Sequence, residues 1–143
     1  MLFFHDEAVA LAAGHRPCAL CRRDAYDAYR RAWVASLGGP LPLARQMDRR
    51  LHGERIVRGT HRRRLHPARW SDLPDGAFVL ADGGPAVVFR DAVVPWTVQG
   101  YAGARRRPAH GRVELITPPS TVAALAAGYR PQIDRMALRG WTA

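Results

Sequence analysis

The stretch AFVLADGGPAVVFRDAVVPW, residues 77–96, indicates the fold class of this 143-residue chain. Its segments 77–81 and 86–90 are short runs of β-prone residues, and DGGP between them, residues 82–85, has the composition of a hairpin turn. Residues 92–96 can continue the same sheet, although a proline interrupts them. The middle of the chain therefore predicts strands that pair in antiparallel order.

Upstream of this sheet the sequence predicts helices. Asp6 can cap a short helix over residues 7–13. Apolar residues at three- and four-residue spacing predict a longer helix over 24–37, and a third helix is predicted over 43–54. RGTHRRRLHPAR, residues 58–69, has no good periodicity and is predicted to be a basic loop. The apolar stripe of the longer helix, which we expect to face the core, consists of Tyr26, Tyr29, Trp33 and Leu37.

Downstream of the sheet-forming stretch, residues 112–117 predict another strand, and PPST, residues 118–121, predicts the start of a helix. We expect Ser120 or Thr121 to cap this helix and Gly128 to end it. ALAAGHRP before the cysteines recurs as ALAAGYRP in this helix, which indicates that the same glycine stop ends both helices.

These elements predict a single α+β domain that spans residues 1–143. Its N-terminal half is helical and carries a CxxC knuckle, a small antiparallel sheet follows, and a helix lies near the C-terminus. The expected sections are an N-terminal knuckle with a helix, a basic connection, and a small sheet with a helix, at residues 1–40, 41–73 and 74–143.

The charge balance of the chain predicts a polyanionic partner. The formal net charge is +10, and every cationic residue is arginine. Guanidinium groups bind phosphate through paired hydrogen bonds, so nucleic acid is the partner we expect, although a solvated basic surface is the alternative. The candidate phosphate contacts are Arg16, Arg22, Arg23, Arg58, Arg62, Arg63, Arg64, Arg105, Arg106 and Arg107.

Membrane insertion is not expected. The sequence has no run of 18 or more apolar residues, and its N-terminus has no basic region that leads an apolar core. These features predict a cytoplasmic protein.

The two cysteines of the chain, Cys18 and Cys21, have the spacing at which two thiolates can share one zinc ion. A structural zinc ion takes four ligands, so two more donors are required. His5 and His15 are the nearest histidines in the sequence. The pair therefore predicts half of a zinc site.

Other interpretations of these residues remain open. A CxxC pair at a helix start can carry thiol–disulfide chemistry, although a strand normally precedes that motif, and the two thiols can also be buried and inert. Asp48 and His52 share a helical face and could serve as an acid–base pair in a metal-free enzyme. A protein-interaction module is a third possibility.

The segment FFHDEAVALAAGHRPCALCRRD, residues 3–24, resembles the second half of the metal-binding domain of Ada-type DNA repair proteins. The family pattern is a pair of aromatic residues and an alanine-rich helix, then Ala-Gly-aromatic-Arg-Pro-Cys, two residues and Cys-Arg-Pro-Asp. This chain has His15 where the family has an aromatic residue and Arg23 where it has proline. The rest of the chain resembles uncharacterised actinobacterial proteins that carry such a segment. The matching positions are Phe3, Phe4, Ala12, Ala13, Gly14, Arg16, Pro17, Cys18, Cys21, Arg22 and Asp24.

The resemblance implies that Cys18 and Cys21 are zinc ligands and that the partner is DNA, in repair or damage response. In the family, four cysteines hold the zinc ion, and one of the two earlier ones accepts a methyl group from a DNA methylphosphotriester. Both earlier cysteines precede the matching stretch, so no residue of this sequence takes the methyl-acceptor role. We expect either that the protein begins further upstream or that its metal site is completed differently, and the resemblance favours a protein that is not an enzyme.

Overall fold

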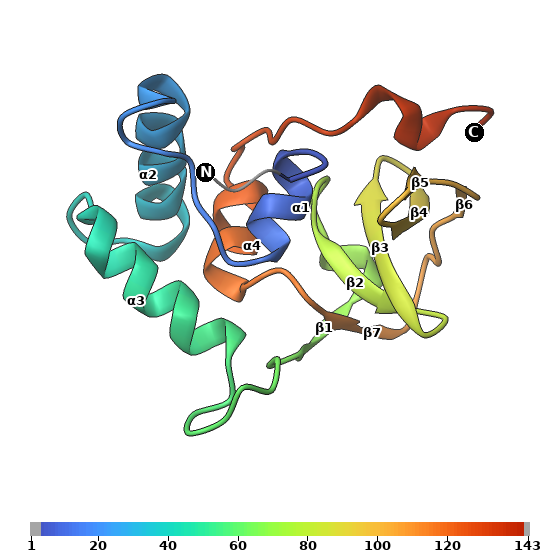
Figure 1. The fold of residues 1–143 in the computed structure, drawn as a ribbon, viewed down its shortest axis with the longest axis horizontal. Coiled ribbons are helices and arrows are strands. Elements are labelled where there is room, and N and C mark those ends of the chain that lie inside the picture. The colour runs from blue at the N-terminus through green and yellow to red at the C-terminus, as the bar shows by residue number, and fades with distance from the viewer. Residues whose placement is uncertain (1–3, 142–143) are drawn as a thin grey trace.

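The computed structural model describes residues 4–141 and has the predicted α+β architecture (Figure 1). Helices fill the first part of the chain, an antiparallel sheet follows, and a further helix leads into the C-terminal segment. The helices are α1 (Glu7–Ala12), α2 (Arg23–Leu37), α3 (Ala44–Arg55) and α4 (Pro119–Ala126), with short 3-10 helices η1 (Trp70–Asp72) and η2 (Arg135–Leu138). The strands are β1 (His66–Arg69), β2 (Phe78–Ala81), β3 (Gly84–Phe89), β4 (Ala92–Thr97), β5 (Gly100–Tyr101), β6 (Arg105–Arg106) and β7 (Arg112–Leu115).

The predicted hairpin forms the centre of the sheet. Asp82 and Gly83 connect β2 to β3 with φ angles of 53° and 81°, as a two-residue turn between right-twisted strands requires. The strand order is β1-β7-β2-β3-β4-β5, with β6 beside β4, and every pair is antiparallel. Pro95 does not end the strand predicted over residues 92–96, because β4 continues through this proline to Thr97.

The prediction of a loop over residues 58–69 is wrong at its C-terminal end. His66–Arg69 forms β1, which pairs with β7 from His66 opposite Leu115 to Arg69 opposite Arg112. This strand carries little local signal, and its hydrogen-bonding partner lies far along the chain. The prediction also missed β5 and β6, which are two residues each and too short to show a period.

The repeated ALAAG segments end their helices in the same way, as the sequence indicated. Gly14 and Gly128 have φ angles of 92° and 112°, in the left-handed region that favours glycine. The N–H of His15 donates to the carbonyl of Ala10, and the N–H of Tyr129 donates to the carbonyl of Ala124, both at 3.1 Å. Both helices therefore stop in a Schellman-type turn.

The predicted cap of α4 is wrong. Its N-cap is Pro118, and Ser120 and Thr121 lie buried inside the helix. The carboxylate of Glu54, at the end of α3, accepts hydrogen bonds from the N–H and the hydroxyl of Ser120 at 2.9 and 2.5 Å. A side chain from another helix thus supplies the acceptor that we expected from a local residue.

α1 and α4 lie between the sheet and the other two helices (Figure 1), and Val122 of α4 packs against the apolar cluster on one face of the sheet. α2 and α3 pack on α4, and α1 packs on β2. Tyr26, Tyr29 and Trp33 of α2 are buried as predicted, whereas Leu37 at its end is 37% exposed. Neighbouring valines of β3 belong to clusters on opposite faces of the sheet, so this strand is buried on both sides. None of the helices within residues 4–141 is long and apolar enough to span a bilayer.

Candidate metal and nucleic-acid site

Cys18 and Cys21 lie in a tight turn between α1 and α2. The N–H of Arg22 donates to the carbonyl of Cys18 at 3.0 Å, which closes the turn. The N–H of Cys21 donates to Cys18 Sγ at 3.3 Å. Cys18 is half-buried and Cys21 is exposed, and both are free thiols. The two thiols are therefore reduced but not buried as a pair, because solvent reaches them.

The two thiols of this turn differ in acidity. Hydrogen bonds from the backbone N–H groups of Cys21 and Leu20, and then from the Cys21 thiol, lower the pKa of Cys18. Because the Cys21 thiol donates to Cys18, the pKa of Cys21 is raised. Thiolates bind metal ions and act as nucleophiles, whereas thiols do not. Cys18 is consequently the sulfur that ionises first.

Two arginine–carboxylate pairs hold the turn from both sides. Before the cysteines, Arg16 donates from Nε and Nη2 to both carboxylate oxygens of Asp48, at 2.9 and 3.1 Å. After them, Arg22 donates to both oxygens of the buried Glu7, at 2.9 and 3.4 Å. Bidentate pairs of this kind fix orientation as well as distance. The protein itself therefore sets the position of the two sulfurs.

A cleft of about 380 Å³ opens beside Cys18 and is also lined by His15, Asp48, His52 and Arg55. The Asp48 carboxylate is bound through both oxygens to Arg16. In the acid–base pair that the sequence suggests, Asp48 with His52, the carboxylate is therefore already bound to a guanidinium group. The ring of His15 packs against Phe4 with centroids 4.7 Å apart.

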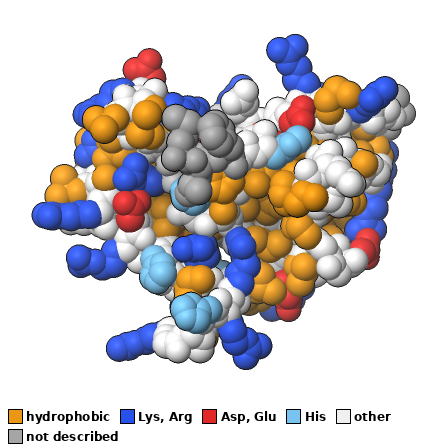
Figure 2. Space-filling view, in the orientation of Figure 1, with side chains coloured by type: hydrophobic (Ala, Val, Ile, Leu, Met, Phe, Trp, Pro, Cys, Tyr) orange, Lys and Arg blue, Asp and Glu red, His pale blue; other side chains and the backbone are white. Residues whose placement is uncertain are grey.

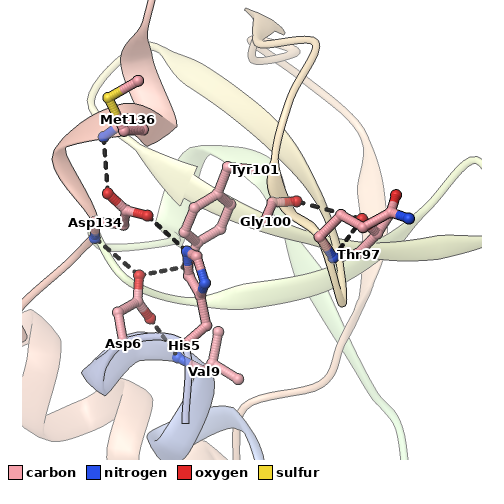
Figure 3. Close-up of polar contacts among 9 residues, drawn as sticks. His5, Asp6, Val9, Thr97, Gly100, Tyr101, Asp134 and Met136 are labelled. Atoms are coloured by element: carbon pink, nitrogen blue, oxygen red, sulfur yellow. Dashed lines mark hydrogen bonds and ion pairs between the residues drawn. The ribbon is translucent and has the colours of Figure 1, made fainter.

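His5, the other candidate zinc ligand, is in a different environment (Figure 3). Its Nε2 lies 2.7 Å from Asp134, and its ring meets the ring of Tyr101 edge-on at 5.3 Å. Tyr101 donates to Asp6 at 2.8 Å, and Asp6 also accepts from the backbone N–H groups of Val9 and Asp134. Burial, followed by the charge of Asp6, raises the pKa of Tyr101. This cluster fastens the start of α1 to the sheet and to the C-terminal segment.

The donor set for a metal ion is incomplete within the chain. Among residues 4–141, no three His, Cys, Asp or Glu side chains are gathered closely enough to hold one ion. Cys18 and Cys21 fit two of the four positions around zinc by donor type and by their shared turn. The remaining donors would be water or groups of another molecule, unless the exposed His15 ring reorients.

The candidate phosphate contacts fall into groups with different partners. Five pair with carboxylates: Arg16 with Asp48, Arg22 with Glu7, Arg23 with Asp27, Arg105 with Asp82 and Arg106 with Asp91. Three donate to backbone carbonyls: Arg63 to Ala12, Arg64 to Gly53 and Arg107 to Trp70. Arg58 and Arg62 are exposed, and no ion pair joins either of them to a carboxylate in the described part of the chain. A carbonyl does not neutralise a guanidinium group. Four of the candidates, Arg58, Arg62, Arg63 and Arg64, therefore keep their positive charge in the loop that follows α3.

This loop and α3 form one basic surface, which we call the α3–loop surface. The bridge between Ile56 and Arg63 makes the loop a hairpin, and it projects from the body of the molecule (Figure 1). Figure 2 shows basic side chains over α3 and around this loop. The surface comprises Arg45, Arg49, Arg55, Arg58, Arg62, Arg63 and Arg64.

Sequence reasoning missed Arg45, Arg49 and Arg55 as members of this surface. The spacing of the first two, four residues apart in a predicted helix, was the available signal. Arg55 lies over Gly14, where a Cβ atom would come within 2.6 Å of its side chain, so Arg55 links the α3–loop surface to the cysteine turn. Strand β6, which carries Arg105 and Arg106, lies at the other end of the long axis from α3 (Figure 1).

Comparison of the chain with protein-family models, with curated proteins and with solved structures gives no match. The resemblance of residues 3–24 to the Ada metal-binding domain therefore stays a prediction.

His15 should make the stability of the protein depend on pH. Partial burial, and then the charge of Arg55, lowers the pKa of His15 from its ordinary value near 6.5. The unfolded chain therefore binds a proton more readily, and the free energy of unfolding should fall as the pH drops through 6.5 to the folded-state pKa. Urea unfolding at a series of pH values should show that the free energy of unfolding falls less on acidification in His15→Gln than in the wild type. His61→Gln, on the exposed loop, is the control and should keep the wild-type loss.

Proposed function

We propose that this protein is a small basic zinc-binding protein that engages nucleic acid, with DNA as the expected form. The α3–loop surface is the phosphate-binding element, and Cys18 and Cys21 are the zinc ligands that the chain supplies. The observation that carries the proposal is that, within residues 4–141, no ion pair joins any arginine of the α3–loop surface to a carboxylate.

The charge arrangement supports the nucleic-acid part of this proposal. In α3 and its loop, the two carboxylates Asp48 and Glu54 accept from Arg16 and Ser120, and Glu54 also pairs with Arg50. Neither of them pairs with Arg58 or Arg62 at the exposed end of the hairpin. A projecting, uncompensated basic hairpin can approach a phosphate backbone without steric obstruction, and such contacts carry no base specificity.

The zinc part of the proposal is supported by the cysteine turn. Both sulfurs lie in one turn, and backbone N–H groups stabilise the thiolate of Cys18. A zinc ion held there would have a structural role, and the neighbouring Arg22 and Arg23 are already paired with Glu7 and Asp27. Such a function in DNA repair or damage response follows only from the likeness of residues 3–24 to Ada proteins.

Removing the two arginines at the end of the hairpin should weaken binding to nucleic acid. We expect Arg58→Gln/Arg62→Gln to lower the affinity for a short duplex DNA of arbitrary sequence by about tenfold near physiological salt, because two phosphate contacts are lost. The slope of log K against log salt should become shallower by about 1.8, since each contact contributes about 0.9. Fluorescence anisotropy over a range of salt concentrations measures both quantities.

The matched control is Arg135→Gln/Arg139→Gln, which removes the same charge from exposed positions in and just after η2. It should leave the salt slope near the wild-type value. Equal effects of the two double variants would mean that net charge, and not the α3–loop surface, determines binding. Affinity that does not change with salt would contradict the phosphate-contact proposal altogether.

A further inference from the structure

The cysteine turn has a property that neither zinc binding nor nucleic-acid binding requires. The backbone N–H of Cys21 donates a hydrogen bond to Cys18 Sγ at 3.3 Å, so one cysteine contacts the sulfur of the other. The hydrogen bond from Arg22 N–H to the carbonyl of Cys18, at 3.0 Å, closes the same turn. One tight turn therefore carries both cysteines, which is the arrangement that a disulfide between close neighbours in the sequence requires.

We propose that Cys18 and Cys21 form a dithiol that is oxidised reversibly to a disulfide by small-molecule disulfides such as oxidised glutathione. This activity is independent of the zinc proposal, because it concerns the metal-free pair. The inference rests on the tight turn in which the Cys21 N–H contacts Cys18 Sγ, on the access of solvent to the pair and on the two arginine–carboxylate pairs that hold the turn.

The exchange proceeds in two balanced steps. One cysteine thiolate attacks a sulfur of the small disulfide, which forms a mixed disulfide and releases one small-molecule thiolate. The second cysteine, as its thiolate, attacks the protein sulfur of that mixed disulfide and releases the second small-molecule thiolate. The protein loses two hydrogens overall, and the small disulfide is reduced to two thiols.

The fold favours the second step over a competing reaction with another small molecule. Arg16–Asp48 and Arg22–Glu7 hold the residues on either side of the cysteines, so the turn that carries both sulfurs is kept in one shape. Holding reacting groups together replaces a bimolecular step with an intramolecular one. In proteins where a strand precedes the CxxC pair, the sheet positions the motif, and here the two ion pairs take that role.

The test uses the full chain, freed of metal with a chelator and titrated with mixtures of reduced and oxidised glutathione. Intact-mass spectrometry of the wild type should show loss of two hydrogens and no bound glutathione. Cys18→Ser and Cys21→Ser should each gain one glutathione, because the resolving sulfur is missing. The oxidation constant of the folded protein should exceed that of the same chain in urea by about tenfold or more, since folding holds the sulfurs together.

A wild type that accumulates bound glutathione, or that stays reduced in oxidising mixtures, would overturn the inference. Equal oxidation constants in buffer and in urea would also overturn it, because the fold would then contribute nothing. The zinc proposal is judged separately, by the metal content of the reduced protein. Zinc can therefore be absent while exchange is present, and the reverse can also occur.

Discussion

Replacing Glu7 with alanine should lower the free energy of unfolding by about 3 kcal/mol, the largest effect that we expect from a polar substitution in this protein. Glu7 is 8% exposed and accepts hydrogen bonds from Arg22, from the hydroxyl of Tyr129 and from the N–H of Gln132. Its removal leaves these donors without their acceptor in a partly buried setting, which costs more than the hydrogen bonds themselves contribute.

The Glu7 substitution also tests how the cysteine turn is held. Glu7 joins α1 to the residue that follows Cys21 and to the segment after α4. Urea unfolding measures the change, with Glu114→Ala as the control on an exposed strand position, where we expect a change within about 0.5 kcal/mol. Similar values for the two variants would mean that the Glu7 network does not stabilise the fold.

Replacing Glu54 with alanine should lower the free energy of unfolding by about 2 kcal/mol. The carboxylate caps α4 through the N–H and hydroxyl of Ser120, where a negative charge also meets the positive end of the helix dipole. Arg50→Ala is the matched control, because it removes the exposed ion pair to Glu54 and leaves the cap in place. We expect this control to change stability by less than about 0.5 kcal/mol in the same urea experiment. An equal loss in both variants would contradict the capping role.

Local signals in the sequence predicted most of the fold. The Asp6 cap, the glycine stops and the DGGP turn depend on neighbours within a few residues, and each of them forms as expected. The cap of α4 and the strand β1 could not be predicted in this way. Their partners, Glu54 for Ser120 and β7 for β1, lie far along the chain.

In the candidate site, too, the features set by neighbouring residues were predictable and those set by distant residues were not. The turn that brings Cys18 to Cys21 is local, so the spacing of the motif anticipated it. The partners of Arg16 and Arg22 depend on how α1 and α3 pack around that turn, and no sequence pattern connected Arg16 with Asp48 or Arg22 with Glu7. For the same reason, net charge could not show which arginines are neutralised by carboxylates and which leave the α3–loop surface basic.

The zinc content of the reduced protein, purified without a histidine tag, tests the proposed function most directly. We expect close to one zinc ion per chain by atomic emission, loss of the metal in Cys18→Ser, and retention in His5→Gln, because His5 pairs with Asp134. Protein without bound zinc, whose two thiols react freely with a thiol reagent, would contradict the proposal that Cys18 and Cys21 share a metal ion.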